Sequence, residues 1–160
     1  MKKFMFEPLI YTFKNFPYKS CLGLSVFEFH KLTSDFQLFQ DEIIKLKPTI
    51  VIGVAKSPTN KSNFESRAVN QYNHAKKLDV GGIYEYTLDY PENGFGSIGI
   101  SADFTDSFCN WTMYRISQIL VGTDTRLQFI HIAEPDLPDM EKYLMYIRDN
   151  KVQYLSVSDS

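Results

Sequence analysis

The residues of this chain with the clearest capacity for chemistry are a cysteine and a histidine, Cys109 and His131. Asp106 or Ser107 is suited to cap a helix that would hold Cys109 in its first turn. There the free amides and the helix dipole favour a thiolate, and the same amides could receive an oxyanion. His131 ends a short β-type run, and open α/β sheets commonly display functional groups at the carboxyl ends of their strands. The pair suggests nucleophilic catalysis, with a small core cysteine and a structural histidine open as alternatives.

Hydrophobic patterning predicts the elements that would position these two residues. Strand candidates with alternating or β-branched character lie at 2–6, 22–29, 49–53, 82–90, 97–104 and 127–132. Helical spacing predicts helices from Thr33 or Ser34 up to Pro48, from Asp106 or Ser107 to Leu120, and from Asp136 or Asp139 to Ile147. This order predicts an α/β fold, a three-layer sandwich with a mixed, mostly parallel central sheet flanked by helices. The length of 160 residues fits a single domain over 1–160.

Composition and charge exclude several classes of function. The chain is 44% hydrophobic and 22% charged, as in an ordinary globular protein. Its 17 Lys and Arg against 19 Asp and Glu give a net charge of -2 with no basic block. We therefore expect no nucleic acid and no anionic membrane among its partners. The longest apolar run, Thr49 to Ala55, is far shorter than the ~20 residues of a membrane span.

The first residues and the cysteines indicate the compartment. Lys2 and Lys3 begin like a signal peptide, but Glu7 and Pro8 interrupt the apolar stretch. We therefore expect a cytoplasmic protein. Only two cysteines occur, fewer than a secreted domain that relies on disulfides would carry, so both are expected to be free thiols.

Cofactor and metal motifs are weak. Gly94 to Gly99 satisfies the G-x-G-x-x-G pattern of dinucleotide-binding sites, but it follows a turn and leads into a strand candidate instead of opening a helix. The three histidines, His30, His74 and His131, are too widely spaced for a helical metal site. We expect neither a cofactor nor a metal ion.

Three segments, taken in order, carry a family resemblance. They read Glu65-x-x-Ala68-x-Asn70, Ser101-x7-Cys109-Asn110-x3-Tyr114 and Phe129-Ile130-His131. Together they resemble the signature segments of the pyroglutamyl peptidases, also called pyrrolidone-carboxylate peptidases. The resemblance implies that Glu65, Cys109 and His131 form a catalytic triad. Without the resemblance, we would expect Glu65 to be an ordinary exposed acidic residue. Less specific matches are Phe6-Glu7-Pro8 and Lys47-Pro48 followed by a strand ending Gly53-Val54-Ala55.

The match departs from the family pattern around the substrate. Family members bind a neutral five-membered lactam, which requires flat apolar walls. Phe6 and Phe108 match wall positions, and Leu9 replaces a wall phenylalanine; for Phe6, core packing is an equal alternative. The other departures are Met5 for Gly, Val54 for Gln, Ser66 for Arg with Arg67 one place late, and Phe104-Thr105 for Ala-Gly. The stretch from Glu65 to Ser101 is also shorter than the family usually shows.

The sequence therefore predicts a cysteine peptidase that removes an N-terminal pyroglutamyl group from a peptide or small amide. In such an enzyme the thiol attacks, the imidazole moves the proton and the carboxylate orients the imidazole. We expect the helix terminus and an adjacent imidazolium to lower the pKa of Cys109 toward neutrality. Two other functions stay open: a catalytically weak relative that acts as a binding protein, and an amidase for another small acyl group. The sequence does not specify the oligomeric state, and a homo-oligomer is possible.

Overall fold

The structure of the protein is a computed structural model that describes residues 8–23, 25–72, 76–105 and 107–149. Its helices are α1 (Leu32–Leu46), α2 (Phe108–Leu120) and α3 (Leu137–Arg148), with 3-10 turns η1 (Lys19–Leu22) and η2 (Glu134–Asp136). Its strands are β1 (Leu9–Phe13), β2 (Val26–Phe29), β3 (Ile50–Lys56), β4 (Asn63–Glu65), β5 (Arg67–Val69), β6 (Glu85–Thr87), β7 (Gly99–Ser101) and β8 (Arg126–Ile132). No helix within these residues is both long and apolar enough to cross a membrane.

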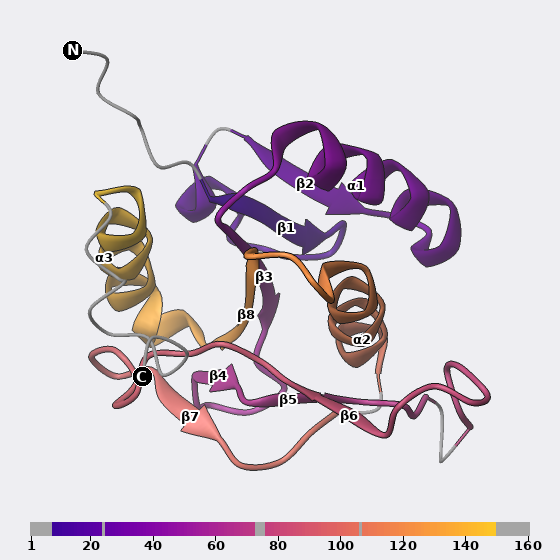
Figure 1. The fold of residues 1–160 in the computed structure, drawn as a ribbon. Coiled ribbons are helices and arrows are strands. Elements are labelled where there is room, and N and C mark those ends of the chain that lie inside the picture. The colour runs from indigo at the N-terminus through magenta and orange to yellow at the C-terminus, as the bar shows by residue number, and fades with distance from the viewer. Residues whose placement is uncertain (1–7, 24, 73–75, 106, 150–160) are drawn as a thin grey trace.

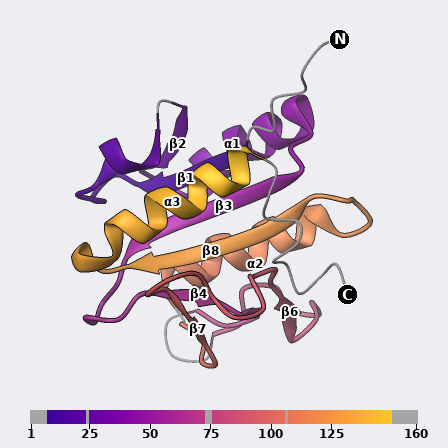
Figure 2. The same ribbon diagram turned by 90° about the vertical axis from the view of Figure 1, so that its left-hand side faces the viewer.

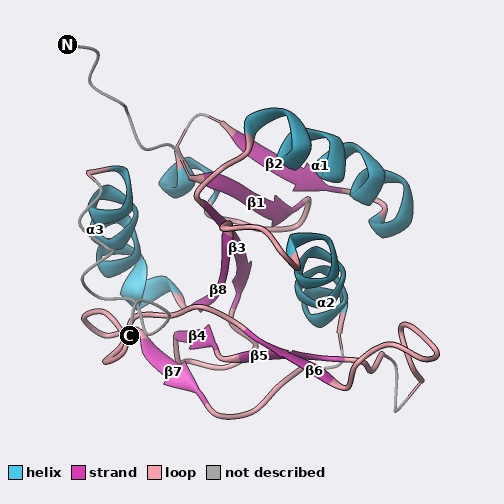
Figure 3. Ribbon diagram, in the orientation of Figure 1, coloured by secondary structure: helices cyan, strands magenta, loops and turns pink. Residues whose placement is uncertain are grey.

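Six of the strands form a mixed, mostly parallel sheet in the order β2-β1-β3-β8-β4-β7. The pairs β1–β2, β1–β3, β3–β8 and β4–β7 are parallel, and β4 runs antiparallel to β8. Strands β5 and β6 form a separate antiparallel pair beside α2 (Figure 3). The predicted α/β class with a mixed sheet is confirmed.

Helices cover both faces of the sheet (Figures 1 and 2). In β3, Val51 and Ala55 face the core beneath α1 and α2, whereas Ile50, Ile52 and Val54 face the core beneath α3. Side chains alternate between the faces of a strand, so a central parallel strand covered on both faces is apolar throughout. This explains the continuous β-branched run of β3 and confirms the predicted three-layer sandwich.

The first strand that the structure describes is not among those predicted from the sequence. The predicted strand at 2–6 lies outside the described residues, and β1 is a further strand that begins after Phe6-Glu7-Pro8. In β1, Tyr11 and Phe13 join the core beneath α1 and α2, and Ile10 joins the opposite core. The reason lies in pairing partners: β1 forms ladders with both β2 and β3, and these ladders hold the segment from Leu9 as a strand.

The start of helix α1 differs from the sequence prediction in its capping. Helix α1 begins at Leu32 with no side-chain bond from its N-cap residue, so the expected caps Thr33 and Ser34 are wrong. Instead Asp35 Oδ2 accepts hydrogen bonds from the amides of His30 and Lys31, at 2.6 and 2.8 Å. A carboxylate in the first turn reaching back in this way satisfies amides that the helix itself leaves unpaired.

The glycine-rich segment at 94–99 forms a turn docked on α3. Asp139 Oδ2 accepts hydrogen bonds from the amide and the hydroxyl of Ser97, at 2.8 and 2.7 Å. Phe95 packs edge-on against Tyr143 of α3, and Gly99 begins strand β7. The segment leads into a strand, as predicted. The side chain of Asp139 binds this turn through Ser97 and does not cap α3, although the sequence suggests that it could.

Candidate active site

Cys109 lies in the first turn of α2, as the sequence predicts. Ser107 is the N-cap residue, and its Oγ accepts a hydrogen bond from the Cys109 amide at 3.3 Å. A serine cap satisfies one of the amides that a helix start leaves free, and the amides in that turn carry the positive end of the helix dipole. The side chain of Cys109 points inward, because the residue is only 3% exposed.

His131 and Glu65 form a buried hydrogen-bonded pair beneath this helix. His131 Nδ1 lies 2.7 Å from Glu65 Oε1, and the two residues are 5% and 4% exposed. They meet because β4 runs antiparallel beside β8, with Asn63 opposite His131. Alternation then turns Asn63 and Glu65 to one face of β4 and Phe64 to the α3 core.

The pairing determines which nitrogen of His131 carries a proton. An ionised carboxylate can only accept, so Nδ1 must donate to Glu65 Oε1. Whenever the imidazole is neutral, Nε2 is then its basic nitrogen, and Nε2 makes no hydrogen bond within the described part of the chain. A base oriented through its other nitrogen by a carboxylate is the arrangement that activates a nucleophile in hydrolase triads.

The thiol lies on the same face of the sheet as the histidine. The ring of Phe129 contacts that of His131 at a centroid distance of 5.0 Å, and Phe129 and Cys109 belong to one buried cluster. Burial raises the pKa of Cys109 to about 12; Ser107 acts to lower it, and the nearby Glu65 charge raises it further. Within the described residues no hydrogen bond joins the thiol to His131. The expected low pKa is therefore wrong for this free state, because desolvation outweighs the helix dipole.

Asn110 holds the strand segment after Glu65 against α2. Its side-chain oxygen accepts from the Val69 amide at 2.9 Å, and its amide group donates to the carbonyls of Val69 and Gln71 at 2.9 and 2.8 Å. Asn110 is fully buried, so these three bonds satisfy a polar group that would otherwise be costly. The sequence marks Asn110 as part of the Cys-Asn motif but does not reveal this role.

A second contact joins β1 to the first turn of α2. Thr112 Oγ1 donates to the Cys109 carbonyl at 2.8 Å, so the Tyr11 hydroxyl, 3.0 Å away, donates to Thr112. The Tyr11 ring passes over Gly53, where an added Cβ would lie 2.4 Å from its Cζ atom. The glycine therefore leaves room for the ring that supports the cysteine turn.

The fold and this geometry can be compared with those of known proteins. No family model matches the sequence, and no curated protein matches it. Among solved structures, pyroglutamyl peptidase I from Bacillus amyloliquefaciens is similar at a TM-score of 0.68 and 16% identity, covering 88% of this chain and 94% of that one. This chain has the pyroglutamyl peptidase fold.

Two further pyroglutamyl peptidase structures agree. Pyrrolidone carboxyl peptidase from Thermococcus litoralis gives a TM-score of 0.68 at 16% identity, covering 92% of this chain and 94% of that one. The enzyme from Thermus thermophilus gives 0.60 at 14% identity, covering 89% and 100%. The resemblance found in the sequence is thus confirmed at the level of the fold.

The residues expected to line a pyroglutamyl pocket are only partly brought to this site. Phe6 lies outside the described residues. Leu9 pairs with Val51, whereas His131 pairs with Ala55, four residues further along β3. At about 3.3 Å per residue this separation is roughly 13 Å along the sheet, so the structure does not bring Leu9 beside His131.

An aromatic residue that the sequence analysis did not single out lies close to the cysteine turn. Phe13 ends β1 at the carboxyl edge of the sheet, and its ring packs edge-on against Phe108 at 4.7 Å between centroids. Phe108 directly precedes Cys109 and is 45% exposed, so an apolar surface is available next to the thiol. Sequence reasoning missed Phe13 because the first strand was expected earlier in the chain.

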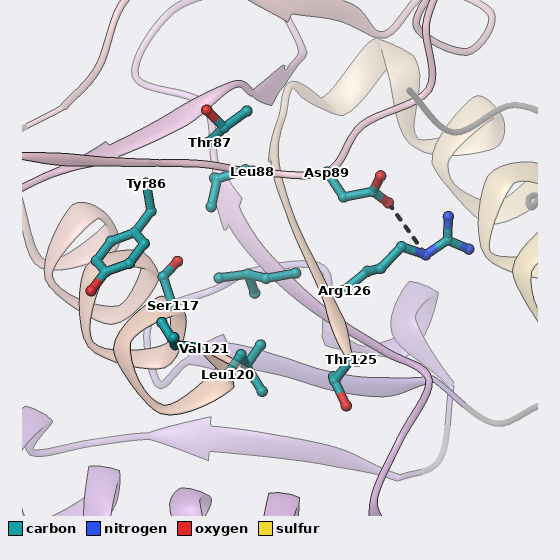
Figure 4. A pocket seen from close by; sticks show the side chains of 10 residues that line it. Tyr86, Thr87, Leu88, Asp89, Ser117, Leu120, Val121, Thr125 and Arg126 are labelled. Atoms are coloured by element: carbon teal, nitrogen blue, oxygen red, sulfur yellow. Dashed lines mark ion pairs between the residues drawn. The ribbon is translucent and has the colours of Figure 1, made fainter. Parts of the chain in front are cut away.

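A cavity of about 410 Å³ lies at the other end of the sheet (Figure 4). It is lined by residues of β6, the carboxyl end of α2 and the start of β8, with Arg126 Nε 3.9 Å from Asp89 Oδ2. His131 lies at the opposite end of β8, so this cavity is separate from the Glu65–His131 pair. Within the described residues, no group of three or more His, Cys, Asp or Glu could hold a metal ion.

Proposed function

We propose that this protein is a cysteine peptidase of the pyroglutamyl peptidase type, which removes an N-terminal pyroglutamyl group from peptides. The proposal depends mainly on the buried 2.7 Å contact between Glu65 and His131. This pair lies on the face of the sheet that α2 covers, and Cys109 is in the first turn of α2. The similar solved structures named above are pyroglutamyl peptidases, and the three residues resemble the motifs of that family in order.

The chemistry begins with a protonated thiol. Since the pKa of Cys109 is raised to about 12 in the free protein, the thiol must lose its proton as it attacks, and Nε2 of His131 is the base that can take it. Sγ then bonds to the acyl carbon of the pyroglutamyl residue, and the carbonyl electrons move to oxygen. Amides in the first turn of α2 are the candidate donors to this oxyanion.

His131 next acts as the acid. The tetrahedral intermediate collapses, the bond from carbon to the leaving nitrogen breaks, and the imidazolium gives its proton to that nitrogen. A thioester of Cys109 remains. Water attacks it while His131 takes a proton from the water, and collapse releases pyroglutamate and restores the thiol. Glu65 keeps Nδ1 protonated in both halves of the cycle.

The lactam ring would rest on the apolar surface formed by Phe13 and Phe108. A neutral five-membered ring needs flat apolar contact, and two aromatic rings packed edge-on supply it beside the nucleophile. Phe6 stays a prediction for this pocket. Leu9 is not part of this proposed surface, because it begins β1 at the end away from Phe13.

Fluorophore release from a pyroglutamyl amide tests the proposal. We expect release by the wild type, none by Cys109→Ala, and undiminished release by Cys21→Ala, because Cys21 is the only other cysteine of the chain and lies in η1. The matching alanyl and prolyl amides, which lack the lactam carbonyl, should be poor substrates. No release from any of these amides, or release that survives Cys109→Ala, would overturn the proposal.

A binding protein without turnover is the second candidate. It is favoured by the 3% exposure of Cys109 and by the absence of a hydrogen bond from its thiol to His131 among the described residues. For that function pyroglutamyl peptides would bind to the wild type and remain intact. The third possibility is an amidase for a different acyl group. In the same assay such an enzyme would release the fluorophore from another N-acyl amide faster than from the pyroglutamyl amide.

A further inference from the structure

Arg67 joins the segment that follows Glu65 to the segment that precedes Cys109. Its guanidinium carbon lies 5.2 Å from the centre of the Phe104 ring, in the loop before α2. Its Nη1 lies 3.2 Å from Glu85 Oε2 on the neighbouring strand β6. The side chain is 34% exposed, so part of it remains in contact with solvent beside the ring.

One edge of this guanidinium has no hydrogen-bond partner among the residues that the structure describes. Nε is buried and makes no hydrogen bond within the described residues, and only Nη1 is used by Glu85. The edge formed by Nε and Nη2 is the side-on fork with which arginine binds a carboxylate through two parallel hydrogen bonds. Stacking on Phe104 holds that fork in one plane. Because Nε has almost no exposed surface, a carboxylate reaches the fork from the side of Nη2 and displaces the atoms that cover Nε.

The position of Arg67 relates this fork to the reacting atoms. Arg67 is two residues from Glu65, and the intervening Ser66 donates to the Ser101 carbonyl at 2.6 Å. On the other side, Phe104 is followed by Thr105, whose hydroxyl lies 3.3 Å from that of the cap Ser107. The guanidinium is therefore tied to both segments that carry the catalytic residues.

The order of the strands indicates which part of a substrate would meet it. In the sheet, β1 with Phe13 lies on one side of β8 and β4 with Glu65 lies on the other. If the acyl ring rests on Phe13 and Phe108, the chain beyond the scissile bond extends past His131 toward β4 and β5. Arg67, the first residue of β5, lies in that direction.

We propose that Arg67 is a specificity-determining residue that binds a carboxylate on the leaving side of the scissile bond. This inference rests on the proposed peptidase function. The carboxylate could belong to an acidic side chain in the residue after pyroglutamate, or to the free carboxyl end of a dipeptide. Both present the same planar anion to the fork formed by Nε and Nη2.

Three pyroglutamyl dipeptides test the proposal and separate the two sources. Pyroglutamyl-glutamine amide is neutral, pyroglutamyl-glutamate amide adds a side-chain carboxylate, and pyroglutamyl-glutamine with a free carboxyl end adds a terminal one. We expect the wild type to favour at least one acidic peptide over the neutral peptide by about 10-fold in kcat/KM. Arg67→Gln should bring that ratio close to one, and Arg67→Lys, which keeps the charge but not the fork, should give an intermediate ratio.

Arg115→Gln is the matched control, because the guanidinium of Arg115 also lies over an aromatic ring, that of Trp111 at 6.0 Å, but on α2. It should leave the ratio unchanged. Equal kcat/KM for acidic and neutral peptides in the wild type, or a preference that survives Arg67→Gln, would overturn the role of Arg67 while leaving the peptidase function intact. If none of the peptides is cleaved, the peptidase function fails. Calorimetric titration of the peptides into Cys109→Ala then decides on the carboxylate site, because equal affinities would overturn it.

Discussion

Replacing Glu65 by glutamine separates the two effects that this carboxylate has on the site. Glutamine has the same shape and keeps an oxygen that can accept from Nδ1 of His131, but it carries no charge. The lost interaction is a buried charge-assisted hydrogen bond of 2.7 Å, a class worth about 1.5 to 3 kcal/mol. At about 1.36 kcal/mol for each factor of ten, kcat/KM should fall about 10- to 150-fold, because the imidazolium that forms during the reaction loses its counter-charge.

The same substitution should make the thiol more acidic. The carboxylate of Glu65 raises the pKa of Cys109, so removing its charge lowers that pKa and increases the thiolate fraction at any pH below it. Glu65→Gln should therefore alkylate faster at Cys109 while it hydrolyses a pyroglutamyl amide more slowly. A mutation that merely loosened the fold would also expose the thiol and lower its pKa, because burial is the larger cause of the raised value. An unchanged free energy of unfolding in urea for Glu65→Gln is therefore required to assign the faster alkylation to the lost charge.

Rates of iodoacetamide labelling at Cys109 between pH 7 and 10, followed by peptide mapping, measure the first effect, and fluorophore release measures the second. Glu28→Gln is the matched control, since Glu28 Oε1 lies 3.3 Å from His30 Nε2 in a pair that is open to solvent. It should change neither rate. The reasoning is refuted if Glu65→Gln hydrolyses the amide as fast as the wild type, or if its thiol becomes less reactive.

Three other perturbations follow from the structure. Cys109 should alkylate slowly at pH 7 and accelerate about tenfold per pH unit up to pH 10, since its pKa is raised to about 12 and the thiolate is the reactive form. Gly53→Ala should lower the free energy of unfolding by about 1 to 3 kcal/mol, because its Cβ would lie 2.4 Å from Tyr11 Cζ in a packed core; urea unfolding measures this. Hydrogen bonds from Ser97 lower the pKa of Asp139, so its contribution to stability is present above the unfolded pKa of ~3.9 and is lost as the pH falls through the depressed folded pKa. Asp139→Asn should therefore flatten the loss of stability below about pH 4 in acid titrations.

Each of these has a control and a contrary result. Labelling of Cys21 in the same samples shows the reagent is active, and rapid labelling of Cys109 at pH 6 to 7 would contradict the raised pKa. Gly99→Ala, whose added Cβ would first meet Asn63 Oδ1 at 3.3 Å, should cost less than Gly53→Ala, and equal costs would argue against the core contact. Asp103→Asn is the control for Asp139, and identical acid profiles of wild type and Asp139→Asn would contradict the role of the Ser97 contact.

The sequence alone determined the local features of this protein. A serine followed by an apolar helical pattern located the start of α2, and with it Cys109, because capping and helical spacing depend on neighbours in the chain. The apolar run ending at His131 located β8 and the end of the strand at which the imidazole lies. The motif order further indicated the α/β fold, since the spacing of these segments follows the order of strands and helices.

The tertiary structure decided how these pieces meet. Glu65 becomes the partner of His131 only because β4 runs antiparallel beside β8, a pairing between residues 66 positions apart. The register of β1 against β3 placed Leu9 four residues from the level of His131 and brought Phe13 to the carboxyl edge, in contact with Phe108. Strand pairing and register depend on partners remote in the sequence, so local pattern does not specify them.

The acidity of the thiol was decided in the same way. From its place in the first turn of α2, the sequence predicts a lowered pKa for Cys109, because the helix dipole and the cap act locally. In the fold the same side chain is covered by the core beneath α1 and α2 and lies near the Glu65 charge, and both raise that pKa. Desolvation depends on every element packed over a group, so only the assembled layers determine the protonation state from which the cysteine must react.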